Sequence, residues 1–237
     1  MKEVIYTIPI NDAYDVKCGC PVCRLEKKLD LESREYVMGA AMMEPDVRIE
    51  TNRLGFCSRH FSEMLTMKNR LSLALMLQSY LGDLLEHGFK DNLTHVSKRD
   101  FEAISHKIHE SSESCFICER VREKLGLYAR NIVYLWESEP EFREKTRAQE
   151  YFCPKHLSLL LETAKPLISK RSYSAFLDDH FFATKKILAG LSDDVTKFCN
   201  SYNYMFRDIP LGDAKTSIER TIDFLNGDNV KNETENS

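Results

Sequence analysis

The sequence predicts an all-α fold, and three observations support this prediction. Glycine and proline are scarce, at 9 and 7 of 237 residues, which disfavours a turn-rich all-β fold. Apolar residues recur every three or four positions along most of the chain, as they do in amphipathic helices. Only the short lead-in at 4–8 has the character of a strand.

The first half of the chain is expected to form several helices. Apolar residues at helical spacing follow Cys23 up to Pro45, which stands where a second, short helix would begin. Gly55 stands where that helix would end. A long helical pattern then covers 60–85, and a connecting helix is expected at 98–110.

The second half shows the same kind of pattern. A predicted helix over 117–136 precedes Pro140, and another helix begins near His156. Further helices are expected at 174–188, 195–206 and 214–225. The polar residues 228–237 lack apolar anchors and predict a disordered tail.

Eight cysteine and histidine residues form four pairs, each with two residues between its members. The pairs are two C-x-x-C motifs and two C-x-x-H motifs: Cys20 and Cys23, Cys57 and His60, Cys115 and Cys118, Cys153 and His156. The C-x-x-C motifs are 95 positions apart and the C-x-x-H motifs 96 positions apart, so one inserted residue accounts for the difference. A fixed offset of this kind predicts a duplicated unit.

Residues outside these pairs follow the same offset. The matching segments are Glu44-Pro45, Arg48 and Thr51 in the first copy and Glu139-Pro140, Arg143 and Thr146 in the second. We therefore expect a first repeat with its linker helix at 1–110 and a second repeat with the C-terminal helices at 111–227.

The paired residues predict two metal sites, one in each repeat, that join helix N-termini. Three thiolates and one imidazole are a typical tetrahedral shell for structural zinc. The sequence thus predicts two zinc ions, each held by one C-x-x-C and the C-x-x-H that follows it. An iron–sulfur cluster is the alternative cofactor, since thiolates are its usual ligands. Buried, reduced cysteines without metal are the remaining interpretation.

Cys18 adds a third thiol next to the first motif, but its counterpart in the second copy is Glu113. It could replace His60 as a ligand, act as a redox-sensitive spare thiol, or be a free thiol without a role.

Composition limits the classes of partner. The net charge of −4 gives no overall attraction to nucleic acid or to an anionic membrane. Neither a secretory signal nor a membrane-spanning run is evident. We expect a cytoplasmic protein with reduced cysteines, and neither nucleic acid nor a membrane as partner.

No catalytic motif is evident, so no catalytic residues are assigned, and the sequence favours a non-enzyme while leaving an enzyme as an alternative. Three weaker groups remain: His106 with His109, Asp178 and Asp179 with His180, and the aromatic stripe Phe198, Tyr202 and Phe206. The first two fit solvated helix faces, and the stripe fits core packing or a ligand site. Cys199 is expected to be buried.

These motifs resemble those of a bacterial family of unknown function. Its members share Cys-Pro-x-Cys, then Arg, Asn and Gly-Phe-Cys-x-x-His, and a second Cys/His set. The corresponding residues here are Cys20-Pro21-Val22-Cys23, Arg48, Asn52, Gly55-Phe56-Cys57, His60, Cys115, Cys118, Cys153 and His156. The resemblance implies metal binding but no activity. The family's late Asp-Tyr-Arg element is replaced by Asn203-Tyr204-Met205, and its occasional label as transporter substrate-binding protein has no support in this sequence.

The resulting hypothesis is a zinc-binding helical protein that acts as a binding or regulatory module for an unknown protein or small molecule. The alternatives are a metal-thiolate redox sensor and an enzyme with a pocket in the helical bundle.

Overall fold

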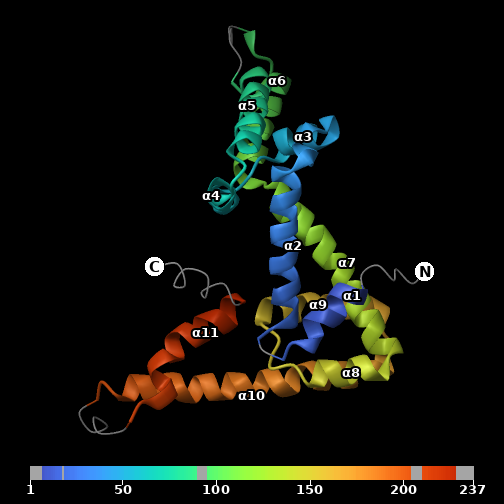
Figure 1. The fold of residues 1–237 in the computed structure, drawn as a ribbon, viewed down its shortest axis with the longest axis vertical. Coiled ribbons are helices and arrows are strands. Elements are labelled where there is room, and N and C mark those ends of the chain that lie inside the picture. Colours follow the sequence, from blue (N-terminus) through green and yellow to red (C-terminus); the bar gives the residue numbers. More distant parts are fainter. Residues whose placement is uncertain (1–6, 18, 90–94, 204–209, 228–237) are drawn as a thin grey trace. The chain divides into compact units, whose positions relative to one another are not determined.

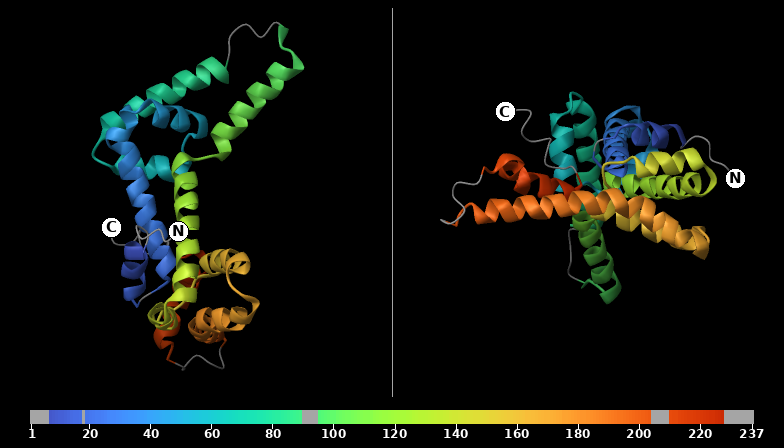
Figure 2. Two further views of the ribbon diagram at one scale, coloured as in Figure 1. Left: turned by 90° about the vertical axis from the view of Figure 1, so that its right-hand side faces the viewer. Right: turned by 90° about the horizontal axis from the view of Figure 1, so that it is seen from below.

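The computed structural model describes residues 7–17, 19–89, 95–203 and 210–227, and these residues contain helices and no strand (Figures 1 and 2). The predicted all-α fold is confirmed. Thr7 and Ile8 of the predicted lead-in belong to the first helix instead of a strand. The predicted tail at 228–237 lies outside the described residues.

The elements up to residue 113 are α1 (Thr7–Asp15), α2 (Pro21–Met38), the 3-10 helix η2 (Ala40–Met43), α3 (Pro45–Leu54), α4 (Ser58–Thr66), α5 (Arg70–His87) and α6 (Lys98–Glu113). The pattern expected at 60–85 is therefore divided between α4 and α5. Asn69 causes part of this division, because its side chain accepts a hydrogen bond from Ser72 N and so caps the start of α5.

The later elements are α7 (Phe116–Ser138), α8 (Pro140–Arg147), α9 (Pro154–Leu167), η4 (Lys170–Ser172), α10 (Tyr173–Asn200), η6 (Gly212–Thr216) and α11 (Ser217–Asn226). The two helices expected at 174–188 and 195–206 are a single helix, α10, as far as Asn200. Gly190 lies inside it, and one glycine costs a helix only about 1 kcal/mol.

The chain divides into two compact units. Unit 1 contains Met1–Glu26 and Leu125–Ser237, and unit 2 contains Lys27–Lys124. Unit 2 is thus an insertion into unit 1 along the sequence, and α2 and α7 each contribute residues to both units. The boundary at residue 110, inferred from the repeat, stays a prediction about the limits of the repeats.

Unit 2 is built around the packing of α3 against α5. Pro45 occupies the first turn of α3, and Gly55 ends that helix with a φ of 61°. A β-carbon at Gly55 would lie 2.7 Å from the hydroxyl oxygen of Tyr80, so only glycine fits between α3 and α5 here. Asn52 and Ser79 join the same two helices through a hydrogen bond of 2.8 Å.

Unit 1 has an aromatic core. Its largest fully buried side chains include Trp136, Phe142, Phe152 and Phe176, which come from α7, α8, the segment before α9, and α10. Trp136 Nε1 donates a hydrogen bond of 2.9 Å to Asp179, so the one polar atom of the indole ring is satisfied inside this core.

The same order of elements occurs twice along the chain. A long helix after a C-x-x-C motif leads to a short helix that begins at proline, and the next helix is capped by the cysteine of a C-x-x-H motif. Thr51 and Thr146 are both buried, and each donates a hydrogen bond to a carbonyl of its own helix. Duplication itself stays a prediction from the sequence.

Candidate metal centres

The structure gathers all eight predicted metal ligands into two groups of four. Cluster 1 consists of Cys20, Cys23, Cys153 and His156, and cluster 2 consists of Cys57, His60, Cys115 and Cys118. Within each cluster the potential ligand atoms lie within 4.8 Å of one another. Cluster 1 lies in unit 1 and cluster 2 in unit 2.

The pairing of the motifs differs from the prediction that each repeat holds its own metal. Each C-x-x-C motif joins the C-x-x-H motif of the other repeat. The reason is the length of the helices that begin at the C-x-x-C motifs. The 18 residues of α2 span ~27 Å, whereas the 10 residues of α3 span only ~15 Å and cannot return the chain to the start of α2.

Helix N-termini position the ligands of cluster 1. Cys20 precedes α2 and Cys23 lies in its first turn, while Cys153 is the N-cap of α9 and His156 lies in its first turn. Unpaired N–H groups and the positive end of the helix dipole both favour thiolates at such positions. Gly19, with a φ of 66°, supplies the left-handed turn that leads into Cys20.

The distances in cluster 1 match a tetrahedral site. His156 Nδ1 lies 3.2 Å from the sulfur atoms of Cys23 and Cys153 and 3.8 Å from that of Cys20. The sulfur atoms of Cys23 and Cys153 are 3.5 Å apart. A tetrahedral zinc site with ordinary bond lengths has edges of ~3.8 Å between sulfurs and ~3.6 Å between sulfur and nitrogen.

The other ring nitrogen of His156 faces a carboxylate. Nε2 lies 3.1 Å from Oε2 of Glu26, and Lys155 Nζ lies 2.6 Å from Oε1 of the same carboxylate. Burial opposes protonation of His156, but the contacts with Cys153, Cys20 and Glu26 raise its pKa to about 11. Glu26 thus lies at ion-pair distance behind the ring, but His156 Nε2 donates it no well-aligned hydrogen bond.

Cluster 2 is assembled by contacts between its two motifs. Cys57 is the N-cap of α4, and Cys115 and Cys118 lie at the start of α7. Phe116 N donates a hydrogen bond of 3.0 Å to Gly55 O, and Ser114 Oγ donates one of 2.7 Å to Leu54 O. These bonds hold the segment before α7 against the segment before α4.

The distances in cluster 2 also fit a tetrahedron. His60 Nδ1 lies 3.1 Å from the sulfur of Cys115, 3.3 Å from that of Cys57 and 3.5 Å from that of Cys118. The sulfurs of Cys57 and Cys118 are 3.9 Å apart. The sulfur–sulfur separation is close to the ~3.8 Å edge of a zinc site, and the nitrogen–sulfur separations are up to about 0.5 Å shorter than the ~3.6 Å edge.

His60 also has a carboxylate behind it, and here the two groups are hydrogen-bonded, unlike His156 and Glu26. Its Nε2 lies 2.8 Å from Oδ2 of Asp30, which also accepts hydrogen bonds from Arg59 and Arg34. Burial would lower the pKa of His60, but Asp30 and Cys115 raise it to about 9. Burial would likewise raise the pKa of Asp30, but His60 and Arg59 lower it to about 2, so Asp30 is a carboxylate at neutral pH.

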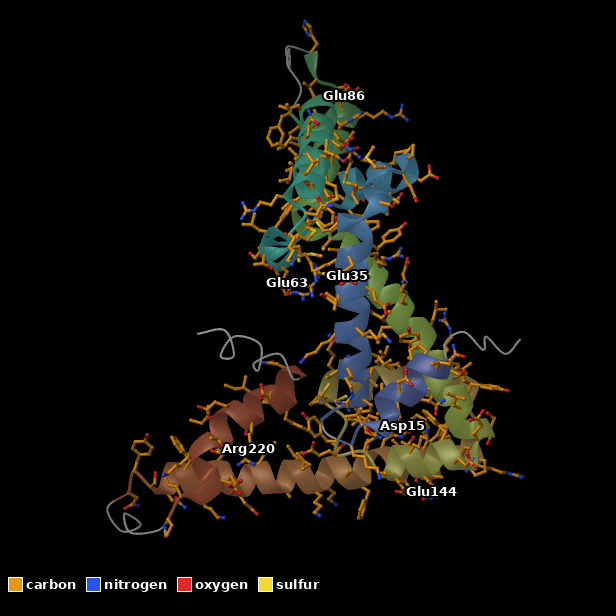
Figure 3. All side chains as sticks on the ribbon, in the orientation of Figure 1. Asp15, Glu35, Glu63, Glu86, Glu144 and Arg220 are labelled. Atoms are coloured by element: carbon orange, nitrogen blue, oxygen red, sulfur yellow. The ribbon has the colours of Figure 1, made fainter. Side chains whose placement is uncertain are left out.

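Asp30, His60 and Glu63 form a third group of possible ligands, but two arginines already balance its charge. Arg59 lies 2.9 Å from Asp30 and 3.2 Å from Glu63, and Arg34 lies 2.9 Å and 3.4 Å from the same two carboxylates. Figure 3 labels Glu63 on α4. This group needs no ion and instead supports His60.

Contacts among the thiols shift their pKa values in opposite directions. The hydrogen bond with Cys118 lowers the pKa of Cys115 to about 3 and raises that of Cys118. In cluster 1 the hydrogen bond with Cys20 lowers the pKa of Cys153, and the bond with Cys153 raises that of Cys23. Each cluster therefore holds a thiolate before any metal binds, and a divalent cation would replace the remaining protons.

The donor sets fit a thiophilic tetrahedral ion such as zinc. Each site offers three sulfurs and one imidazole nitrogen, with a carboxylate behind the imidazole. Four protein ligands leave no open position for a reacting water, so both sites have the form of structural sites.

The other candidate residues from the sequence are not brought together into a site. His106 and His109 are both exposed on α6. Asp178 is exposed, and Asp179 is held by Trp136 and by Arg147 at 2.6 Å. His180 is fully buried, and its pKa is lowered to about 4 by burial.

Of the C-terminal aromatic stripe, the structure describes Phe198, which is half-buried, and Tyr202, which is exposed. Phe198 and Tyr202 contact each other with ring centroids 5.5 Å apart, but Tyr202 is 80% exposed, so the expected core packing is wrong at this residue. Cys199 is exposed, contrary to expectation, because it lies on a solvent-facing side of the last turn of α10. Three predictions from the sequence fall wholly or partly outside the described residues. They concern Phe206 of the aromatic stripe, the spare thiol of Cys18, and Tyr204 and Met205 of the element that differs from the family.

Sequence reasoning missed Glu26 and Asp30, the two carboxylates behind the histidines. The positions 95 residues later hold Val121 and Leu125, so the repeat contains no trace of them. Both follow Cys23 on α2, at spacings of three and seven residues that keep to one helix face. That spacing was the only available signal.

The family model that describes a family of unknown function (DUF6062) matches residues 1–232. The chain belongs to this family. No curated protein and no solved structure matches it. Among the described residues of this DUF6062 member, no helix has both the length and the apolarity needed to cross a bilayer.

Proposed function

We propose that this DUF6062 protein binds two zinc ions, one in each cluster, and that both ions are structural. The observation that carries this proposal is the shared geometry of the two histidines. Each directs Nδ1 toward three sulfurs and Nε2 toward a carboxylate, at 2.8 Å for Asp30 and 3.1 Å for Glu26. Because three sulfurs converge on the Nδ1 atom of each imidazole, the geometry favours metal over buried, reduced thiols.

The bound ions would act as cross-links. Cluster 1 joins residues 20–23 to residues 153–156 and thus ties together the two sequence segments that form unit 1. Cluster 2 joins the start of α4 to the start of α7 within unit 2. A cross-link stabilises a fold mainly by restricting the unfolded chain, and long loops gain the most.

A closed ligand set favours a binding or regulatory module over a metalloenzyme, because no coordination position is free for substrate or water. Its partner is a protein or a small molecule rather than nucleic acid, consistent with the net charge of −4. The need for reduced thiolate ligands supports a cytoplasmic location.

Metal analysis with a visible absorption spectrum tests the proposal, on protein purified without added metal and without air. Two zinc ions per chain and a colourless solution are expected. Iron with acid-labile sulfide and a brown chromophore would replace the proposal with an iron–sulfur protein. A chain that carries no metal and takes up none from a zinc buffer would refute metal binding altogether. The Cys199→Ser variant is the control, because this exposed cysteine belongs to neither cluster and its loss should leave two zinc ions.

A further inference from the structure

The two clusters differ in the burial of their cysteine residues. In cluster 1 all four ligands are buried, and none of its cysteines is more than 2% exposed. In cluster 2 Cys115 and His60 are buried, but Cys57 and Cys118 are half-buried. Because oxidants must reach a sulfur to react with it, the two clusters should differ in reactivity.

The burial of cluster 1 has an identifiable cause. Gly227 ends α11 in the left-handed conformation, and a β-carbon there would lie 3.0 Å from the sulfur of Cys23 and 3.5 Å from that of Cys153. Phe224, one turn earlier, is buried and packs on Tyr151. The end of α11 therefore covers the thiols of cluster 1.

Cluster 2 has an arginine beside its histidine. Arg59 Nη2 lies 2.8 Å from Nε2 of His60 and pairs with Asp30 and Glu63. The Arg59 side chain is 56% exposed, so it forms no cover. The half-buried Cys57 and Cys118 are therefore the cysteines of the two clusters that an oxidant reaches most easily.

We propose that cluster 2 is a peroxide-sensitive site at which Cys118 and Cys57 form a disulfide; this inference rests on the proposed metal binding. The Cys118 sulfur, deprotonated in the zinc-loaded chain, attacks one oxygen of hydrogen peroxide, the O–O bond breaks, and the sulfur becomes a sulfenic acid while the hydroxide that leaves takes up a proton to form water. The Cys57 thiolate then attacks that sulfur, the S–O bond breaks, and a second water forms. The two sulfurs together supply the two electrons that reduce the peroxide.

The geometry favours this pair of cysteines. Their sulfurs are 3.9 Å apart and must approach by roughly 1.9 Å to reach the ~2.05 Å of a disulfide bond. The disulfide would leave Cys115 and His60 as the only ligands of cluster 2, and two ligands do not hold zinc tightly. Oxidation would thus release one ion from unit 2 and leave cluster 1 intact.

Hydrogen peroxide added to the zinc-loaded full chain tests this inference. Zinc content is measured first, since a chain without two zinc ions refutes the proposed function rather than this inference. Native mass spectrometry then follows the remaining zinc, and peptide mapping under non-reducing conditions identifies the disulfide. We expect one zinc to be lost at least ~10-fold faster than the other, together with a Cys57–Cys118 disulfide. Equal rates, earlier loss from cluster 1, or a disulfide between other cysteines would overturn the inference.

A double variant sharpens the test without removing a ligand. Cys18→Ser with Cys199→Ser lacks both non-ligand cysteines, and it should lose the same single zinc at the same rate. A slower loss in this variant would mean that Cys18 or Cys199 takes part and would contradict the assigned mechanism.

Discussion

Gly227 lies so close to Cys23 that any side chain at this position would meet the thiol. A β-carbon built on Gly227 would be 3.0 Å from the Cys23 sulfur, and the backbone there has a φ of 80°. The last residue of the C-terminal helical segment is therefore part of the wall of cluster 1. Its conformation and its size both require glycine.

Gly227→Ala should destabilise unit 1 and loosen cluster 1. The left-handed backbone costs alanine roughly 1–2 kcal/mol, and the methyl group also displaces Cys23 or the end of α11. Gly212→Ala is the matched control, because Gly212 has a φ of 51° but no atom within 4 Å of its added β-carbon. Chelator competition should show faster loss of one zinc in Gly227→Ala only. Equal zinc loss in the two variants would mean that Gly227 does not cover the cluster.

Asp30→Asn should weaken zinc binding at cluster 2, and Glu26→Gln should weaken it at cluster 1. Each change removes the charged partner of a histidine Nε2, for which losses of roughly 10–100-fold in metal affinity are typical. Titration with a competing chelator should therefore show one weakened and one unchanged site in each variant.

Glu63→Gln provides the control for Asp30→Asn. Glu63 pairs with Arg34 and Arg59, as Asp30 does, but its ion pairs are longer, and it is Asp30 that accepts the hydrogen bond from His60. Zinc affinity at cluster 2 should remain near the wild-type value. If Glu63→Gln loses as much zinc affinity as Asp30→Asn, the loss comes from the ion pairs with the arginines and not from the hydrogen bond with His60.

His180 should make the stability of unit 1 depend on pH between about 6.5 and 4. Its folded pKa of about 4 lies below the ordinary histidine pKa of 6.5, so between these pH values the unfolded chain binds a proton that the folded chain does not. The stability that the neutral His180 contributes is therefore fully present above pH 6.5, and roughly 3 kcal/mol of it is lost as the pH drops to 4.

His180→Phe removes this titration while keeping a ring next to Phe176 and Phe152. Urea unfolding of the two proteins at pH 7 and pH 5 isolates the effect, since loss of zinc in acid affects both equally. Between pH 7 and pH 5 the unfolding free energy of the wild type should fall by more than that of the variant. An equal fall in the two proteins would show that His180 does not titrate in this way.

Much of the metal chemistry could be predicted from the sequence, because it depends on local spacing. Two residues between Cys115 and Cys118 place both side chains at one helix N-terminus whatever the rest of the chain does. The proline-started helices at Pro45 and Pro140 were predictable for the same reason, since proline favours the first turn.

The pairing of the motifs was not predictable from spacing, because it depends on how far each helix carries the chain. The repeat suggested that Cys20 and Cys57 share a metal. However, α2 carries the chain farther from Cys20 than the shorter helix α3 can bring it back. Tertiary packing also decided the roles of Glu26, Asp30 and Gly227. Nothing in their local sequence distinguishes them from a solvated carboxylate or an ordinary helix-ending glycine.

Zinc affinities of two double-cysteine variants test the crosswise pairing most directly, measured by native mass spectrometry with a competing chelator. Cys20→Ala with Cys153→Ala removes two ligands from cluster 1 and should leave one zinc at wild-type affinity. Cys20→Ala with Cys57→Ala removes one ligand from each cluster and should weaken both sites. The opposite result, with one intact site in the second variant and two weakened sites in the first, would show that each repeat holds its own metal and would contradict the arrangement described here.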